Sequence, residues 1–442
     1  MRIDLNNFGE LKSKNIIIFV STIHPNFSTL VLLEIIAYIC CFYLLFPIGS
    51  SLFSVLCNRR IPARGGMQSD FACVITVYKE LDIAWPLVRS LLAQNYPHYH
   101  IYLVVDNVSF ATAPLEDDRL SILKPRMSLH SKVASIQYIL DRMRAQHTHV
   151  VIFDPDNLVP AHFLTAIDSY HQAGYPAVQG RRIAKNMDAT YAALDAMGEY
   201  FYDFTVRKVP FSLGSSSVIA GSGMSVRRDL YEYSISNEVK ELKRLGVVVA
   251  EDKALQLFLV NKGHRIAYAP DAIIFDEKVV SFDQVSRQRS RWLNSYFRHS
   301  LQVLKTLVSG LAKMDWNRLW FAVTTLMPPL FILVFTSVFL MLVFLLLEPS
   351  VSLAIGLSLI GFSVGFVLIL ILNRTPAQVL RVLPKVPLFI IGQVAGLLKI
   401  KKANKDFLAT SHKEIVEIDA VWETRKHEFE HLAWWENEHP KL

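Results

Sequence analysis

Two aspartates separated by one residue follow a short apolar run near the middle of the chain. Asp154 and Asp156 form the sequence D-P-D-N directly after H-V-V-I-F. Two carboxylates on a tight turn suit a divalent metal ion, which also accepts the oxygens of a diphosphate. The same four residues also make an ordinary turn, so the pair alone does not establish a metal site. The residues around it decide between the two interpretations.

Other residues with reactive or charged side chains lie at the ends of apolar runs on either side of this pair. Asp106 ends the run I-Y-L-V-V, and the pair Glu251–Asp252 follows V-V-V-A. Residues Gln288–Trp292 form a basic and aromatic Q-x-x-R-W cluster shortly before a long apolar segment. Carboxylates at such positions are candidates for acid–base catalysis, and the arginines are candidates for binding anions.

Residues 65–285 have the pattern of a soluble domain in which strands and helices alternate. Apolar runs rich in β-branched residues predict buried strands, and helical periodicity predicts the helices between them. Strands are expected at Phe71–Val77, Ile101–Asp106 and His149–Asp154, and helices at Trp85–Gln94, Ser131–His147 and from Pro160 onward. The alternation predicts an α/β fold with a doubly wound, mostly parallel sheet. Ligands bind beyond the carboxyl ends of such strands, where Asp106 and Asp154 are expected.

Three apolar segments are long enough to cross about 30 Å of hydrocarbon. They are residues 27–57, 319–347 and 351–372, and an N-terminal segment, 1–26, precedes the first. Buried helices of a soluble domain are the alternative, but lengths beyond about 18 residues with almost no charge favour membrane spans. The first run is too long, and starts too late, for a cleaved signal peptide. Residues 386–400 are apolar but short and end in K-I-K-K, which favours an interfacial or re-entrant helix.

Basic residues beside the apolar segments predict an orientation in the membrane. They follow the first segment, precede the second and follow the third: Arg59, Arg60, Arg64, Arg318, Arg374, Arg381 and Lys385. This predicts that the soluble domain and a tail, residues 401–442, lie in the cytoplasm, with interfacial helices at 286–317. Lys12 and Lys14 point weakly in the opposite direction.

The composition excludes several classes of protein. Hydrophobic residues make up 52% of the 442 residues and charged residues 19%, so a disordered chain is excluded and a purely soluble protein is not expected. The net charge of +7 is too mild to imply a nucleic-acid partner. The four cysteines form no C-x-x-C pair, which disfavours a disulfide framework or a cysteine-based zinc site. A dinucleotide-binding dehydrogenase would need G-x-G-x-x-G after the first strand, where the chain reads V-Y-K-E-L-D.

In this order, and with apolar segments at both ends, the motifs resemble those of the membrane-integrated glycosyltransferases of family 2. That group includes cellulose, chitin and hyaluronan synthases. The resemblance covers Phe71–Arg298, about half of the chain, and it extends to V-Y-K-E, L-L-A-Q-N-Y-P, H-S-K-V-A-S-I, V-Q-G-R-R, G-S-G-M-S-V-R-R and W-L-N-S-Y-F-R. The chain departs from many relatives at Asn107 and Val108, which follow Asp106 where those relatives have a second Asp.

The resemblance implies a sheet of the glycosyltransferase A type and an inverting transfer from a nucleotide-sugar, with a UDP-sugar expected. It implies Mg²⁺ or Mn²⁺ as the cofactor, held by Asp154 and Asp156, which would neutralise the leaving diphosphate. The residues that would bind the nucleotide are Tyr78, Glu80, Asp106, Lys132 and Asp154.

The same resemblance assigns roles on the acceptor side. Asp252 is expected to be the general base, with Glu251 as the second candidate. The remaining positions are expected to bind the acceptor or the diphosphate: Gln288, Arg291, Trp292, Gly221, Ser222 and Gly223. Among them, a guanidinium suits phosphate oxygens and an indole offers a platform for a sugar ring.

Several of these residues also have simpler interpretations. Glu251 could be a solvated residue at a helix start, where the helix dipole favours a negative charge. Lys132 could be a surface lysine, and Trp292 could be an anchor at the membrane interface. Arg287 and Arg289 are expected to contact lipid headgroups rather than substrate.

The acceptor has two interpretations. A growing polysaccharide at the cytoplasmic membrane face is expected, and transfer of a single sugar to a membrane lipid is the alternative. Three spans make a thin wall for a polymer channel, so a partner subunit or a homo-oligomer is also conceivable. A transporter would need polar pairs or helix breaks at mid-membrane, and the chain offers only Pro328–Pro329, near the start of a span.

Overall fold

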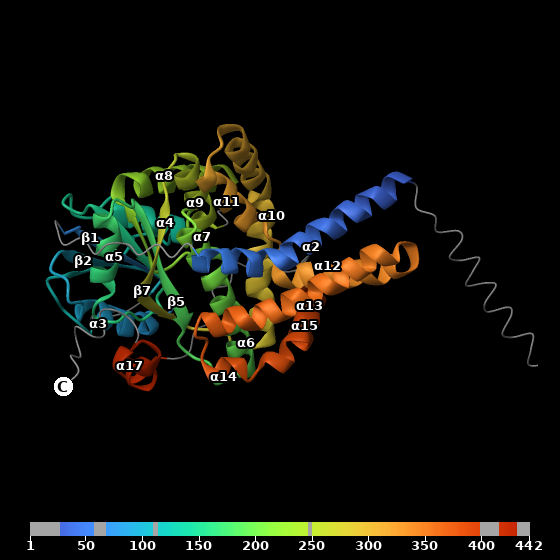
Figure 1. Ribbon diagram of the computed structural model, residues 1–442. Coiled ribbons are helices and arrows are strands. Elements are labelled where there is room, and N and C mark those ends of the chain that lie inside the picture. Colours follow the sequence, from blue (N-terminus) through green and yellow to red (C-terminus); the bar gives the residue numbers. More distant parts are fainter. Residues whose placement is uncertain (1–26, 57–67, 109–113, 246–249, 398–414, 431–442) are drawn as a thin grey trace, which may run out of the picture. The chain divides into compact units, whose positions relative to one another are not determined.

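The computed structural model describes residues 27–56, 68–108, 114–245, 250–397 and 415–430 (Figure 1). They form two compact units. Of the described residues, one unit contains those up to Phe46 together with Ile332–Val364, and the other contains those within Pro47–Phe331 and those from Gly365 to residue 430. Among the features expected from the sequence, the segment 1–26, the basic residues Arg59, Arg60 and Arg64, and most of the tail lie outside the described residues.

A seven-stranded sheet lies at the centre of the larger unit, with the strand order β3-β2-β1-β4-β6-β5-β7. Its strands are β1 (Phe71–Tyr78), β2 (Tyr99–Asp106), β3 (Leu120–Leu123), β4 (His149–Phe153), β5 (Ala177–Ala184), β6 (Met224–Arg227) and β7 (Ile266–Asp276). β1 is parallel to β2 and β4, β2 to β3, and β5 to β7, whereas β6 is antiparallel to β4 and β5. The predicted α/β fold with a mostly parallel sheet is confirmed.

Helices of the larger unit connect these strands and continue beyond them. They are η1 (Asp82–Ala84), α3 (Trp85–Leu92), α4 (Lys132–Leu140), α5 (Phe163–Gln172), α6 (Thr190–Tyr202), the π-helix η2 (Asp203–Lys208), α7 (Val209–Ser212), α8 (Arg228–Leu245), α9 (Glu251–Asn261), α10 (Phe282–Lys313), α11 (Trp316–Leu326), α14 (Ala377–Leu380), η3 (Leu383–Lys385), α15 (Val386–Leu397), α17 (Ile418–Arg425) and η4 (Lys426–Glu428). α4 ends at Leu140, seven residues earlier than the helix expected to reach His147.

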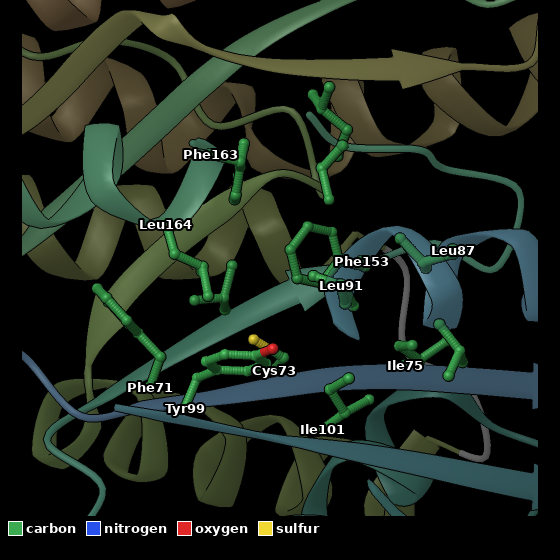
Figure 2. Packing of buried hydrophobic residues seen from close by; sticks show 14 of the residues in the cluster. Phe71, Cys73, Ile75, Leu87, Leu91, Tyr99, Ile101, Phe153, Phe163 and Leu164 are labelled. Atoms are coloured by element: carbon green, nitrogen blue, oxygen red, sulfur yellow. The ribbon is translucent and has the colours of Figure 1, made fainter. Parts of the chain in front are cut away.

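The main core lies between one face of the sheet and the helices α3 and α5 (Figure 2). Alternate residues of β1, such as Phe71 and Cys73, point into it because side chains alternate along a strand. Leu91 of α3 and Phe163 of α5 meet them there, and all four side chains are fully buried. α4 packs against β1 and β2 without joining this cluster, so helices cover both faces of the sheet.

Side-chain caps fix the starts of two helices that carry candidate residues. The Ser131 hydroxyl accepts a hydrogen bond from the Ala134 N–H, which makes Lys132 the first residue of α4. The Ser281 hydroxyl accepts from the Gln284 N–H at the start of α10. α10 then continues without interruption for 32 residues.

Three described helices are long and apolar enough to cross a membrane: α2 (Phe27–Leu56), α12 (Leu330–Leu347) and α13 (Pro349–Leu372). Within the smaller unit, α2 and α13 approach closely at Gly361, where an added Cβ would lie 2.8 Å from Leu45. The segment expected to span from 319 to 347 is divided. α11 ends at Leu326 and α12 begins at Leu330, because Pro328 and Pro329 interrupt backbone hydrogen bonding. The expectation for 386–400, of which the structure describes the helix α15, remains a prediction.

Candidate active site

Lys132 links three segments at the carboxyl edge of the sheet. Its ammonium nitrogen lies 2.8 Å from Oδ1 of Asp154, after β4, and 3.5 Å from Oε1 of Glu251, at the start of α9. It also donates to the Gly221 carbonyl at 3.4 Å. Burial acts to lower the pKa of Lys132, but the two carboxylates outweigh it and raise that pKa. Lys132 is therefore a charged group bound within the site and not a solvated surface lysine.

The two acidic residues of α9 lie at its first turn, behind a strained residue. Ala250, the N-cap, has a φ of 61°, in the left-handed region that a residue with a Cβ seldom adopts. The Glu251 side chain is 16% exposed, so it is not a solvated residue at a helix start. The pKa of Glu251 is raised. Burial is the largest cause, Lys132 lowers the pKa in opposition, and the neighbouring Asp252 raises it further. Asp252 accepts the Lys253 N–H at 2.9 Å and carries the second carboxylate of this turn.

Asp106 and Tyr78 end adjacent strands and hold the loop that leads into α4. The buried Asp106 carboxylate accepts hydrogen bonds from the Ser128 hydroxyl and from the N–H groups of Leu129 and His130 at 2.8–3.1 Å. The Tyr78 hydroxyl lies 3.1 Å from Nδ1 of His130. These contacts fix the loop immediately before Lys132. Glu80 is exposed at the same edge, one residue after Lys79, whose φ is 71°.

The loop with Gly221, Ser222 and Gly223 borders the acidic turn of α9. Gly221 has a φ of +85°, and an added Cβ would lie 3.6 Å from Oδ2 of Asp252. Gly223 has a φ of +62°, and a Cβ there would lie 2.8 Å from Ile274, so glycine is required on both counts. The Gln179 amide donates to the Ser222 carbonyl at 3.0 Å and holds the loop against β5.

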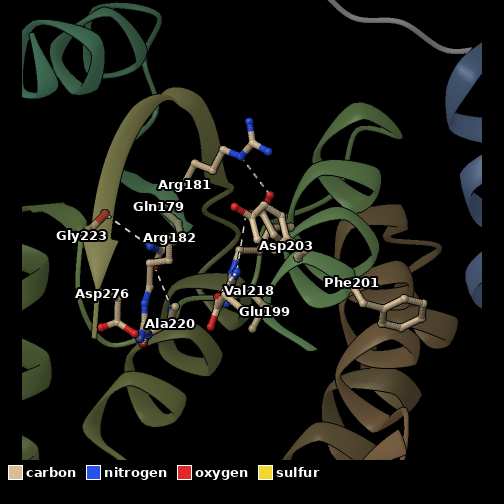
Figure 3. Close-up of polar contacts among 12 residues, drawn as sticks. Gln179, Arg181, Arg182, Glu199, Phe201, Asp203, Val218, Ala220, Gly223 and Asp276 are labelled. Carbon is tan, nitrogen blue, oxygen red and sulfur yellow. Dashed lines mark hydrogen bonds and ion pairs between the residues drawn. The ribbon is translucent and has the colours of Figure 1, made fainter. Parts of the chain in front are cut away.

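A buried network of charges lies beside this loop (Figure 3). Arg182 of β5 donates to the Ala220 carbonyl and to the Asp276 carboxylate, each at 2.6 Å. Burial acts upward on Asp276, but Arg182 and Lys278 outweigh it and lower its pKa to about 2. Glu199 bridges Lys278 at 3.2 Å and Arg207 at 2.7 Å, and its pKa also lies well below the usual range. The sequence carries only one sign of this network, the V-Q-G-R-R segment that contains Arg182.

Gln288, Arg291 and Trp292 lie on α10, which packs against α9. Trp292 is 46% exposed, and the Arg289 guanidinium lies 4.4 Å from the centre of its ring. The contacts of Lys132 include none of the three, so the structure places them on a neighbouring element and not at the lysine itself.

Arg289 forms a largely buried ion pair, which does not fit the expected lipid contact. Its side chain is 14% exposed and donates to the buried carboxylate of Asp195 on α6 at 2.6 Å. The side chain of Arg287 lies outside the description.

The helix α17 near the C-terminus is held to the catalytic domain by Arg425, a residue that the sequence did not single out. Arg425 is 5% exposed and donates to the Ala184 carbonyl, at the end of β5, and to the Tyr200 hydroxyl. Glu428 binds the same guanidinium with both oxygens, at 2.6 and 2.8 Å. Residues more than 200 positions apart thus meet at one edge of the sheet.

Comparison with known proteins decides the family. The family model described as glycosyltransferase like family 2 matches residues 68–295, about half of the chain. The chain belongs to this family. No curated protein matches the glycosyltransferase in sequence.

One solved structure shows the same fold. The glycosyltransferase is similar to the mannosyltransferase PcManGT from Pyrobaculum calidifontis, solved with GDP-Man and Mn²⁺, with a TM-score of 0.52 and 15% identity over 85% of this chain and 100% of that one. Structures of S. aureus TarS also match, over 54% of this chain. One is 15% identical over 40% of its own length with a TM-score of 0.33. Another, TarS residues 1–349 in complex with UDP-GlcNAc, is 14% identical to this chain, is covered over 66% of its own length and has a TM-score of 0.31.

Of the two carboxylates in the acidic turn after β4, one is placed to bind a metal ion. Asp154 is 33% exposed at the sheet edge, and Mg²⁺ or Mn²⁺ commonly binds one or two carboxylates and takes its other ligands from phosphate and water. Asp156 is buried, and its Oδ2 accepts the Glu277 N–H at 3.1 Å. The described residues contain no cluster of three or more His, Cys, Asp or Glu that could hold a metal alone. The donor set therefore suits an ion that the diphosphate of a substrate completes.

Proposed function

We propose that this glycosyltransferase catalyses an inverting transfer of a sugar from a nucleotide-sugar to an acceptor at a membrane. The observation that carries the proposal is the convergence of Lys132, Asp154 and Glu251, with Asp252 on the same turn. A cation between carboxylates, at the carboxyl edge of a parallel sheet, suits an anionic ligand that a metal ion accompanies. The ion pairs of Lys132 bring Asp154 and Glu251 together without a bound substrate.

The donor is proposed to bind along the edge from β2 to β4. Lys132 would pair with the diphosphate, and Asp106 and Tyr78 would shape the nucleotide site through the loop that they hold. Glu80 is proposed to contact the nucleotide from its exposed position. A UDP-sugar is proposed from the resemblance. Because PcManGT was solved with GDP-Man, GDP-sugars belong in the same test.

Mechanism follows from the two carboxylates of α9. Asp252 is proposed as the general base that removes the proton from the attacking hydroxyl, a role typically worth about 10²–10⁴ in rate. Gly221 leaves the space beside Oδ2 of Asp252 free of a side chain. Glu251 is the second candidate, and its pairing with Lys132 makes a positioning role more suitable. Asp154 would hold Mg²⁺ or Mn²⁺, which would supply charge neutralisation for the departing diphosphate, whereas the buried Asp156 would hold the turn through the Glu277 N–H.

Residues of α10 are proposed to serve the acceptor side. Arg291 would bind the diphosphate, the Trp292 ring would stack against the acceptor sugar, and Gln288 would help to close the site. In support, burial lowers the pKa of His299 on α10 while Asp252 acts upward on it, so α10 lies within electrostatic reach of the proposed base.

Membrane association is proposed from the apolar helices and from α10. α10 exposes Phe297, Leu301, Leu304, Val308 and Leu311, at spacings of four and three residues that form one stripe. Between Gln284 and Lys313 it has no acidic residue. An apolar stripe on a basic helix suits the surface of a membrane with anionic lipids. The flanking basic residues support the proposal that the catalytic domain lies on the cytoplasmic side.

A growing polysaccharide is the proposed acceptor, and a membrane lipid is the second candidate. The second candidate is favoured by one observation, the three helices that could cross a membrane in the described part of the chain, which make a thin wall for a polymer channel. Purified protein would be supplied with labelled UDP- and GDP-sugars and lipid extract. Label in polymer supports the synthase, label in the lipid phase supports the second candidate, and label in neither contradicts both.

A further inference from the structure

Tyr231 of α8 carries a buried hydroxyl that no described residue satisfies. Its side chain is 1% exposed, and its hydroxyl oxygen is closed off from water and has no hydrogen-bond partner in the described ranges of the chain. An unsatisfied buried hydroxyl costs about 1–3 kcal/mol, so such a group calls for an explanation. The aromatic ring alone would pack equally well as phenylalanine.

The surroundings of this hydroxyl are the charged residues of the site. α8 packs against both α4, which begins with Lys132, and α9, which begins with Glu251. Burial raises the pKa of the Tyr231 hydroxyl, the Glu251 and Asp252 carboxylates raise it further, and Lys132 opposes them. The hydroxyl thus lies within electrostatic reach of Glu251 and Lys132. A sugar cannot reach an oxygen that is closed off from water, so its partner must come from the protein, and Glu251 on the adjacent helix α9 carries a largely buried acceptor.

The contact between Glu251 and Lys132 is weak. Its 3.5 Å separation from the Lys132 ammonium is an ion pair and longer than an ordinary hydrogen bond. Lys132 is held more closely by Asp154, at 2.8 Å. A nucleoside diphosphate beside Asp154 would draw the ammonium further from Glu251. A buried carboxylate that loses its cation needs another donor to stay ionised.

We propose that Tyr231 is a positioning residue whose hydroxyl donates a hydrogen bond to Glu251 when a nucleotide-sugar engages Lys132. The inference rests on the proposed function, because it needs an anionic donor at Lys132. The hydrogen bond keeps Glu251 ionised and fixes its direction beside Asp252. The hydroxyl without a partner in the structure is then the group reserved for the substrate-bound state.

The test compares Tyr231→Phe with Tyr96→Phe in the full-length chain. Both substitutions remove one buried hydroxyl at constant shape, and the Tyr96 hydroxyl donates to the Ser69 carbonyl at 2.7 Å, away from the proposed site. In Tyr231→Phe we expect affinity for UDP or GDP with Mn²⁺ within about twofold of the wild type and kcat about tenfold lower. The acidic limb of the kcat–pH profile should move up by about one pH unit, because the charged Glu251 carboxylate loses a hydrogen bond and its pKa rises. Tyr96→Phe should keep the wild-type limb.

A second background separates positioning from structural damage. With Glu251→Gln no carboxylate remains to be positioned, so adding Tyr231→Phe should change kcat less than twofold. An equal loss in both backgrounds, or an unshifted acidic limb in Tyr231→Phe, would overturn the inference while leaving the proposed function intact. Failure of the wild-type chain to bind or turn over any nucleotide-sugar would overturn both.

Discussion

The ammonium nitrogen of Lys132 lies 2.8 Å from Oδ1 of Asp154. Lys132 opens a helix and Asp154 follows a strand, so the contact joins two elements that lie 22 residues apart. It exists because β3, whose following loop leads to Lys132, and β4, which Asp154 follows, run parallel in one sheet, so both following segments lie at the same edge. The pair places one positive charge beside the carboxylate best suited to a metal–diphosphate complex.

Removal of the Lys132 charge should weaken the handling of the donor. In Lys132→Gln we expect kcat/KM for the nucleotide-sugar to fall about 100-fold, the loss of one charge-assisted contact to phosphate. Lys240→Gln, at an exposed position on α8, is the control and should keep wild-type values. Nucleoside-diphosphate release measured against donor concentration checks both. Equal kinetics for the two variants would exclude Lys132 from donor binding.

The buried Asp276 should make the fold sensitive to acid. Its folded pKa of about 2 lies below the unfolded value of about 3.9, so its stabilising effect is complete above about pH 4 and is lost as the pH falls toward 2. The expected loss is about 2 kcal/mol. The free energy of unfolding would be measured in detergent from pH 7 to pH 2. In Asp276→Asn it should no longer show this decrease of about 2 kcal/mol at acid pH. The exposed Asp229→Asn should retain it, and identical curves for the two variants would contradict the assignment.

Gly223 should tolerate alanine less well than another glycine with a positive φ. Alanine at Gly223 adds a contact of 2.8 Å with Ile274 to the strain of its φ of +62°, whereas alanine at Gly263, with a φ of +84°, meets nothing within 4 Å. Both variants carry a backbone cost of about 1 kcal/mol. Gly223→Ala should lose a further 1–3 kcal/mol, roughly the cost of overpacking. Thermal unfolding of the two variants measures the difference, and equal midpoints would refute it.

Arg425 should anchor the C-terminal helix to the catalytic domain. Arg425→Ala leaves Glu428 without its bidentate partner and the Ala184 carbonyl without a donor, so we expect a loss of about 3 kcal/mol. Lys426→Ala removes an exposed pair with Glu423 and should change stability little. Thermal unfolding again provides the comparison. An Arg425→Ala midpoint equal to that of Lys426→Ala would show that α17 is not anchored in this way.

The central strands and the acidic positions at their ends could be predicted from the sequence. Apolar runs ending in Asp106 and Asp154 are local signals, and parallel strands carry such ends to a common edge. The structure also brings Lys132 and Glu251, each at the start of a helix, to Asp154. The roles of individual residues in donor and acceptor binding stay predictions.

The remaining features depend on contacts between distant residues, which no local pattern reveals. The antiparallel strand β6 is four residues long and carries no periodic signal of its own. Arg182 and Asp276 are 94 positions apart and form an ion pair only because β5 and β7 are neighbours. Arg289 looked like a surface residue, since nothing in the sequence shows that Asp195 lies opposite it. Nothing in the sequence marks Tyr231, because Lys132 and Glu251, the charged residues that act on its hydroxyl, lie on other helices.

The most direct test of the proposed function compares the wild type with Asp252→Asn and Asp141→Asn, an exposed control on the surface after α4. Purified proteins are assayed for nucleoside-diphosphate release from UDP- and GDP-sugars with Mg²⁺ or Mn²⁺, and for nucleotide binding by calorimetry. The proposed mechanism predicts that Asp252→Asn loses about 10²–10⁴ in rate while nucleotide affinity stays within about threefold, and that Asp141→Asn matches the wild type. Full turnover in Asp252→Asn, or metal-independent release at an equal rate in all three proteins, would contradict it.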